Sequence, residues 1–183
     1  MTLSVTSGAT APGQGDGRPL VVLVGPPGAG KTTVADLLAT RWGAEACDTD
    51  ALVAAQAGKP ISEIFVDDGE LAFRALEQAV VAETLASHRG VLSLGGGAVT
   101  AEPTRALLSS HHVVFLDVGL AAAASRVGLG VTRPLLLGNV RSQLKALLDA
   151  RRPLYEEVAE FTVVTDGLSA DAVADDVERH LRG

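Results

Sequence analysis

A single turn, Gly25-Pro-Pro-Gly-Ala-Gly-Lys-Thr32, constrains the possible fold of this chain more than any other segment. It follows the apolar run Leu20–Val24, which is typical of a strand buried on both faces, and it precedes a helical pattern. Glycines allow such a turn to wrap around an anion, so that N–H groups of the turn and of the new helix point at phosphate oxygens. Spacing and context together predict a phosphate-binding loop for a nucleoside triphosphate. The alternative is a plain glycine-rich turn between a strand and a helix.

Each residue of this loop has an expected role. Lys31 should reach the β- and γ-phosphates, and the Thr32 hydroxyl should ligate Mg²⁺. Backbone amides around these two side chains should hold the phosphates, and they belong to Gly28, Ala29, Gly30 and Thr33. The loop therefore predicts one triphosphate site with one magnesium ion.

Strand-like and helical patterns alternate through the rest of the chain. Short apolar runs predict five strands, at Leu20–Val24, Ala46–Cys47, Val91–Leu94, His112–Leu116 and Phe161–Thr165. Helical material follows each strand, so we expect an α/β fold with a parallel sheet covered on both sides. Ligands of such folds bind at the carboxyl ends of the strands.

The helical segments follow from the spacing of apolar residues. Helices are expected at Thr32–Trp42, Leu52–Ala57, Ile61–Val66, Glu70–His88, Glu102–Ser109, Leu120–Val127, Val140–Ala150 and Ala170–Leu181. In the longest one, the residues spaced for a single buried face are Leu71, Ala75, Leu76, Val80 and Leu85. Gly128–Gly138 is expected to be non-helical, and Arg151–Tyr155 to interrupt a helix at Pro153.

Length and charge limit the remaining possibilities. The chain has 183 residues, which suits one domain, and a net charge of −7, which argues against a nucleic-acid-binding surface. No apolar stretch approaches the roughly 18 residues of a membrane span, and we expect a cytoplasmic monomer. Residues 1–18, rich in glycine, serine, threonine and proline, are expected to be a disordered tail, and residues 19–183 to form the domain.

Aspartates and glycines stand at the ends of the second and third predicted strands. Asp48 and Asp50 lie two apart, so on an extended segment they share a face. We assign Asp48 to Mg²⁺ through bound water, and Asp50 to the pocket of a phosphate acceptor, where it could hold hydroxyls and accept a proton. Either aspartate could instead cap the following helix. Gly95–Gly97 would let a ligand approach the backbone closely, or would form a flexible turn.

Charged side chains on two predicted helices could bind an anionic acceptor. Arg74 and Glu77 lie three apart and can pair on one helical face, although an ordinary surface ion pair explains them equally well. Arg151 and Arg152 suit bidentate binding of a carboxylate, but they could also neutralise the C-terminus of a helix.

A segment rich in glycine between two helices is expected to be a mobile lid. It covers about residues 128–139 and would carry Arg133 over the phosphates, with Arg126 one turn earlier assisting it. An ordinary exposed loop is the alternative. Phosphoryl transfer depends on positioning and on neutralisation of charge, so these features together predict a small-molecule kinase. The absence of an Asn-Lys-x-Asp guanine motif argues against a GTPase.

Taken together, these residues resemble the shikimate kinase family. The resemblance covers about Leu20 to the C-terminus and depends on six motifs that occur in order at fitting spacings. They are Gly25-Pro-Pro-Gly-Ala-Gly-Lys-Thr-Thr33, Asp48-Thr-Asp50, Phe65-x-x-x-Gly-Glu-x-x-Phe-Arg74, Leu94-Gly-Gly-Gly-Ala98, Thr132-Arg-Pro-Leu-Leu136 and Arg151-x-Pro-Leu-Tyr155.

The resemblance implies a P-loop kinase fold with strand order 2-3-1-4-5 and transfer of the ATP γ-phosphoryl group to the 3-hydroxyl of shikimate, a step toward chorismate and the aromatic amino acids. It implies that shikimate is bound by Asp50, Arg74, Gly96, Gly97 and Arg151. By the same resemblance Glu77 orients Arg74, Lys31 and Arg133 neutralise the phosphates, and Arg126 lies near the adenine. Thr32 and Asp48 would hold Mg²⁺.

One segment departs from the family pattern. Where relatives often have a basic or Asn-Pro adenine loop, this chain has Thr165-Asp-Gly-Leu-Ser169, so the base is expected to be held by backbone around Leu168. Gluconate kinases and nucleoside monophosphate kinases are the enzyme alternatives. A non-catalytic nucleotide-binding module is the alternative from another class.

Overall fold

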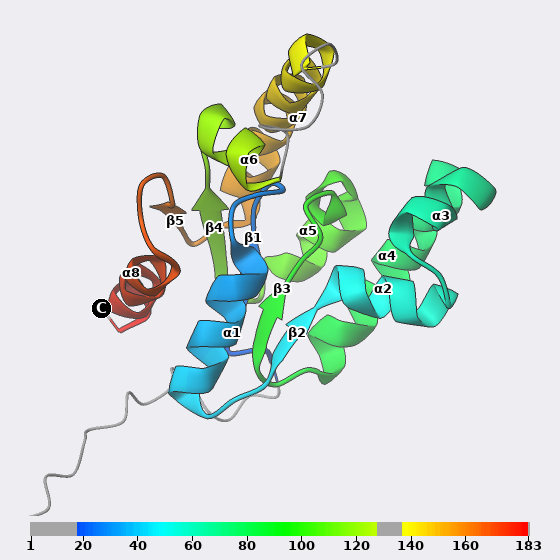
Figure 1. The fold of residues 1–183 in the computed structure, drawn as a ribbon. Helices are drawn as coiled ribbons and strands as arrows, with labels where there is room; N and C mark the ends of the chain where they lie inside the picture. Colours follow the sequence, from blue (N-terminus) through cyan, green and yellow to red (C-terminus); the bar gives the residue numbers. More distant parts are fainter. Residues whose placement is uncertain (1–17, 128–136, 183) are drawn as a thin grey trace, which may run out of the picture.

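Five parallel strands form the centre of the computed structural model, which describes residues 18–127 and 137–182 (Figure 1). The strands are β1 (Val21–Val24), β2 (Ala46–Asp48), β3 (Val91–Ser93), β4 (Val113–Asp117) and β5 (Phe161–Val164). Their order across the sheet is β2-β3-β1-β4-β5, and every pair of neighbours is parallel. The α/β class, the five strands and the implied order are therefore confirmed.

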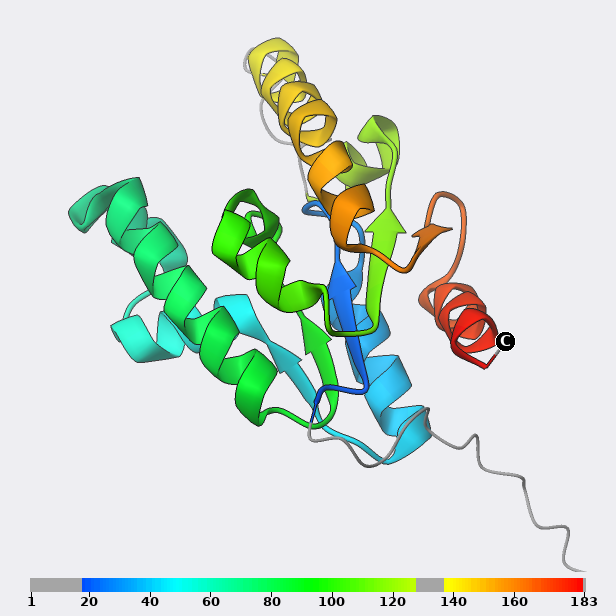
Figure 2. The same ribbon diagram turned by 180° about the vertical axis from the view of Figure 1, so that it is seen from behind.

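Helices follow the strands along the chain. They are α1 (Lys31–Trp42), α2 (Thr49–Ala57), α3 (Ile61–Asp67), α4 (Gly69–Ser87), the 3₁₀ turn η1 (Ala98–Thr100), α5 (Glu102–Leu108), α6 (Leu120–Arg126), α7 (Leu137–Val158) and α8 (Ala170–Leu181). Helices α1 and α8 lie on one face of the sheet, and α4 and α5 lie on the other (Figures 1 and 2).

Alternate residues of β1 enter two separate apolar cores. Val21 and Leu23 pack on the side of α1 and α8, whereas Val22 and Val24 pack on the side of α4 and α5. A strand that is buried on both faces needs apolar residues at every position. This explains why β1 appears in the sequence as a continuous apolar run rather than as an alternating one.

The predicted buried face of helix α4 is confirmed only in its C-terminal half, where Val80 and Leu85 are buried. Nearer its N-terminus Leu71 is 88% exposed and Ala75 is also exposed, whereas Phe73 and Glu77 are buried. The N-terminal half of α4 packs against α2 and α3, so the apolar contact of Phe73 and the ion pair of Glu77 set its orientation. The spacing of apolar residues does not reveal an ion pair, so it could not predict that Glu77 is buried.

The predicted helix break at Pro153 is also wrong. Helix α7 continues through Pro153 to Val158. A proline inside a helix removes one backbone hydrogen bond. Tertiary contacts before and after Pro153 stabilise the helix at this position. Arg152 pairs with Asp117 at 2.7 and 2.8 Å, and the Tyr155 side chain is buried.

Helix α2 begins three residues before the predicted start. Asp48 is its N-cap, and Asp50 already lies in its first turn rather than on an extended segment. The predicted tail lies outside the described residues except for Arg18, and so do Arg133 and most of the predicted lid. None of the helices in the described part of the chain combines the length and apolar character needed to cross a bilayer.

Candidate active site

The turn between β1 and α1 has the geometry of a phosphate-binding loop. Gly28 and Gly30 have φ angles of 82° and 86°, which lie in the left-handed region that favours glycine. A Cβ atom on Gly28 would also lie 3.0 Å from the backbone of Ala123 in α6. The turn therefore needs glycine at these positions, and it directs the N-terminus of α1 toward the site. The first amides of a helix have no partner within the helix, so they are available to an anion.

Lys31 lies folded over this loop. Its Nζ donates to the carbonyl oxygens of Gly25 at 2.8 Å and Pro26 at 3.1 Å. Burial lowers the pKa of Lys31 to about 8, although the carboxylates of Asp50 and Asp48 oppose this shift. The ammonium group is thus held beside the predicted phosphate-binding loop.

The side-chain oxygens of Thr32 and Asp48 lie side by side. Thr32 Oγ1 donates to Asp48 Oδ2 at 2.6 Å, and Ser93 Oγ donates to the same oxygen at 3.3 Å. The other oxygen of Asp48 accepts from the Asp50 amide at 2.9 Å, so Asp48 does cap α2. Capping uses one carboxylate oxygen and leaves the other facing Thr32. Hydroxyl and carboxylate oxygens are the hard donors that Mg²⁺ prefers, and this ion usually takes only one or two carboxylates beside substrate phosphates.

Asp50 lies among charges of both signs. Burial raises its pKa, the neighbouring Asp48 raises it further, and the cations Lys31 and Arg74 lower it. The net direction is upward, which makes Asp50 a stronger base than an exposed aspartate. A Cβ atom on Gly95 would lie 2.3 Å from Asp50 Oδ1, so the carboxylate rests directly on the glycine loop after β3.

Arg74 is held by a buried carboxylate. Its Nη1 donates to Glu77 Oε2 at 2.6 Å, and the Glu77 side chain is only 3% exposed. Burial raises the pKa of Glu77 while the hydrogen bond from Arg74 lowers it. The pair is therefore not an ordinary surface ion pair. A Cβ atom on Gly97 would lie 2.1 Å from Arg74 Nη1, which places the guanidinium against the same glycine loop.

Helix α7 adds a second guanidinium on the opposite side. Arg151 Nη1 donates to the Gly96 carbonyl at 3.2 Å, and Tyr155 Oη donates to the same oxygen at 2.5 Å. Arg152 is directed elsewhere and pairs with Asp117 at the end of β4. Of the two adjacent arginines, only Arg151 reaches the glycine loop. Asp50, Arg74 and Arg151, which are far apart in the sequence, thus converge on Gly95–Gly97.

A separate pocket of about 210 Å³ opens on the other side of the phosphate loop. Arg126 forms part of its wall and donates to the Gly28 carbonyl at 3.1 Å, to Thr165 Oγ1 at 3.0 Å and to the Thr165 carbonyl at 2.9 Å. The remaining lining residues are Ala29, Gly30, Thr33, Val34, Leu168, Ala170 and Val173. The predicted base-binding residues Arg126 and Leu168 therefore line the same pocket. Thr165, which orients Arg126, was not predicted to contribute, because its contact joins residues that are 39 positions apart in the chain.

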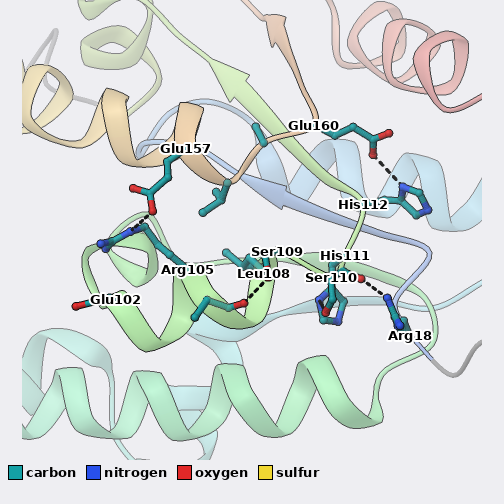
Figure 3. Close-up of a pocket in the computed structure, with 13 residues that line it drawn as sticks. Arg18, Glu102, Arg105, Leu108, Ser109, Ser110, His111, His112, Glu157 and Glu160 are labelled. Atoms are coloured by element: carbon teal, nitrogen blue, oxygen red, sulfur yellow. Dashed lines mark hydrogen bonds and ion pairs between the residues drawn. The ribbon is translucent and has the colours of Figure 1, made fainter.

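A further hollow lies at the other end of the sheet (Figure 3). It has a volume of about 770 Å³ and is far from the phosphate loop, since it adjoins the starts of β4 and β5. Four of its side chains form two pairs, Arg105 with Glu157 at 3.1 Å and His112 with Glu160 at 2.9 Å. We assign it no part in the chemistry.

Comparison with known proteins identifies the family of this chain. The family profile described as shikimate kinase matches residues 27–182. The chain belongs to the shikimate kinase family. A shikimate kinase of Thermobifida fusca is 56% identical over 90% of this chain and 95% of its own length, and one of Saccharopolyspora erythraea is 60% identical over 86% and 90%. A solved shikimate kinase from Acinetobacter baumannii in complex with shikimate has a TM-score of 0.83 and 36% identity, and the match covers 90% of this chain and 93% of that one.

Membership in this family gives the chain its class of activity, which is ATP-dependent phosphorylation of shikimate. The matches cover nearly the whole length of these relatives, so the similarity extends beyond a shared nucleotide-binding module.

Proposed function

We propose that the residues that converge on Gly95–Gly97 hold shikimate with its 3-hydroxyl facing the γ-phosphate of ATP. The observation that carries this proposal is the approach of three charged side chains, Asp50, Arg74 and Arg151, to one glycine loop beside the phosphate loop. Two guanidinium groups suit a carboxylate, and one carboxylate suits hydroxyl groups. Shikimate has both kinds of group.

The acceptor side of the reaction follows from the charges around Asp50. Arg74, oriented by Glu77, and Arg151 bind the substrate carboxylate, while Asp50 accepts hydrogen bonds from the ring hydroxyls. The raised pKa of Asp50 suits it to take the proton that the 3-hydroxyl loses as its oxygen attacks phosphorus. Gly96 and Gly97 offer amides to the substrate, since neither amide donates to a protein acceptor in the described part of the chain.

The phosphate side relies on amides and cations. The Ala29 amide donates to the Pro26 carbonyl at 3.2 Å, so the cradle for the phosphates relies on the amides of Gly28, Gly30, Lys31, Thr32 and Thr33. The Lys31 ammonium balances charge on the β- and γ-phosphates. We infer that Thr32 and Asp48 hold one Mg²⁺, which neutralises phosphate charge when it is bound. Arg133, outside the described residues, is proposed to add a further cation from the predicted lid. The pocket beside Arg126 and Leu168 would receive the adenine.

A coupled assay of ADP release tests the proposed function. With Mg-ATP, shikimate should accelerate ADP formation strongly, and neither gluconate nor AMP should replace it. Turnover with gluconate or AMP instead would assign the pocket to one of the other small-molecule kinases. Binding of ATP with no acceptor-dependent turnover would indicate a non-catalytic module.

Substitution of Asp50 tests its role directly. Asp50→Asn keeps the shape of the side chain and removes the base, so kcat should fall by about 10²- to 10⁴-fold while the affinity for Mg-ATP stays within about twofold. Steady-state kinetics and equilibrium binding of ATP measure the two quantities. Asp67→Asn, at an exposed aspartate of α3, is the matched control and should retain wild-type turnover. Normal kcat in Asp50→Asn would exclude Asp50 as the base.

We also infer that the protein acts as a cytoplasmic monomer with shikimate and ATP as its ligands. The net charge of −7 supports the exclusion of nucleic acid as a partner.

A further inference from the structure

Tyr155 occupies a position that the substrate-binding roles above do not explain. It lies on α7, its side chain is 1% exposed, and its ring stacks on Phe115 of β4 with a centroid separation of 5.0 Å. Burial raises its pKa to about 12, so the phenol is neutral and can donate a hydrogen bond at any physiological pH. A buried apolar ring at this site would satisfy the core equally well, and the hydroxyl therefore requires a separate explanation.

The hydroxyl joins two parts of the substrate site. It donates to the Gly96 carbonyl at 2.5 Å, and Arg151 donates to the same oxygen at 3.2 Å from one helical turn earlier. The neighbouring carbonyls of the loop are satisfied locally, since Gly95 O accepts from the Ala98 amide and Gly97 O from Thr100. Gly96 is thus the position at which the glycine loop is fastened to α7.

The two bonds at the Gly96 carbonyl influence both the amides of the glycine loop and the guanidinium group of Arg151 on α7. The Gly97 amide lies in the same peptide plane as the Gly96 carbonyl, so a bond that holds this carbonyl also sets the direction of the Gly97 N–H group. The Arg151 guanidinium shares that carbonyl, so its position depends on the same contact. Without the phenol, the loop and α7 would be joined there only by the longer bond from Arg151, whose guanidinium is also needed for the substrate.

We propose that Tyr155 is a positioning residue for the acceptor, whose hydroxyl holds the glycine loop and Arg151 in the relative placement that binds the substrate carboxylate. The inference rests on the proposed function, since it assumes that Arg151 and the loop amides contact shikimate. It assigns Tyr155 no contact with the reacting atoms.

Tyr155→Phe removes one oxygen atom and keeps the stacked ring. The KM for shikimate should rise by about 3- to 10-fold, which corresponds to the loss of one hydrogen bond, while kcat and the KM for ATP stay within about twofold. Thr84→Val is the matched control, because it removes a buried hydroxyl that donates to a helix carbonyl at 2.6 Å on α4, away from the glycine loop. It should leave the KM for shikimate unchanged.

A double variant separates positioning from general loosening of the fold. In an Arg151→Ala background, Tyr155→Phe should raise the KM for shikimate by a clearly smaller factor than in the wild type, since one of the two groups that it positions is gone. Full additivity of the two substitutions would overturn the proposal. An unchanged KM for shikimate in Tyr155→Phe, or equal losses for shikimate and ATP, would also overturn it.

The wild-type enzyme in the same assay distinguishes the two proposals. If the wild type phosphorylates shikimate and Tyr155→Phe behaves like it, only the role of Tyr155 fails. If the wild type does not use shikimate, the proposed function fails and the role of Tyr155 fails with it.

Discussion

Lys31 carries a charge that its surroundings partly disfavour. Burial lowers its pKa to about 8, and its ammonium group donates to two carbonyl oxygens of the phosphate loop. A fraction of the molecules therefore has a neutral Lys31 near pH 8. Phosphate oxygens favour the charged form, so ATP binding should raise this pKa.

Proton uptake on ATP binding follows from that shift. The charged form binds ATP, so affinity should be full below about pH 8 and should decline as the pH rises through that value. Calorimetric titrations at pH 8 in two buffers with different ionisation enthalpies would measure the uptake. Lys145→Met, at an exposed lysine of α7, should retain the uptake, whereas Lys31→Met should lose it. Identical heats in both buffers for the wild type would contradict this prediction.

At the scale of elements, the loop after β3 meets helix α4 with no space between them. A Cβ atom on Gly97 would lie 2.1 Å from Arg74 Nη1, and the φ angle of Gly97 is −96°, which any residue can adopt. Glycine is therefore needed at this position for close approach, not for backbone conformation. An added methyl group would displace the guanidinium and leave the loop itself unstrained.

Gly97→Ala should accordingly impair substrate binding rather than folding. We expect kcat/KM for shikimate to fall by about 100-fold with little change in Tm or in the KM for ATP, because a misplaced binding group costs roughly that much. Gly90→Ala provides the contrast, since its Cβ would lie 1.9 Å from the backbone carbonyl oxygen of Glu45. That variant should lose Tm. A Gly97→Ala enzyme with normal shikimate kinetics would show that Arg74 is not a ligand.

At the scale of the whole molecule, the C-terminal helix α8 is fastened to α1, the helix that carries the phosphate loop. Glu178 accepts from Trp42 Nε1 at 2.8 Å and lies 3.4 Å from Arg41 Nη1. Arg41 also pairs with the exposed Asp175 at 2.8 Å. Because the Trp42 side chain is buried, its indole N–H depends on Glu178 as its acceptor.

Glu178→Ala should therefore lower the free energy of unfolding by about 1–3 kcal/mol, the cost of an unsatisfied buried donor. Urea unfolding followed by the fluorescence of Trp42, the one tryptophan in the chain, measures this change. Asp175→Ala removes only an exposed ion pair and should cost less than about 1 kcal/mol. Equal effects of the two substitutions would mean that the indole hydrogen bond contributes nothing particular to stability.

Local features of the fold could be predicted from the sequence. The phosphate loop, the five strands and helix α8, with its bounds Ala170–Leu181, depend on turns and periodicities within a few residues of each other. The start of α2 at Thr49 follows from a local bond, the Asp48 cap that the sequence offered as an alternative. The passage of α7 through Pro153 could not be predicted in this way, because it depends on contacts with a distant segment, such as the pairing of Arg152 with Asp117.

The sequence by itself determined which chemical groups this protein possesses: a glycine turn with Lys31, carboxylates after the second strand, and arginines on later helices. Only the tertiary structure decided which of them act together. It brought Arg151 and Tyr155 to Gly96, directed Arg152 away from the loop, and placed Thr165 against Arg126. The physical reason is range: backbone preferences act between near neighbours in the chain, whereas a hydrogen bond between side chains depends on how separate helices and strands pack.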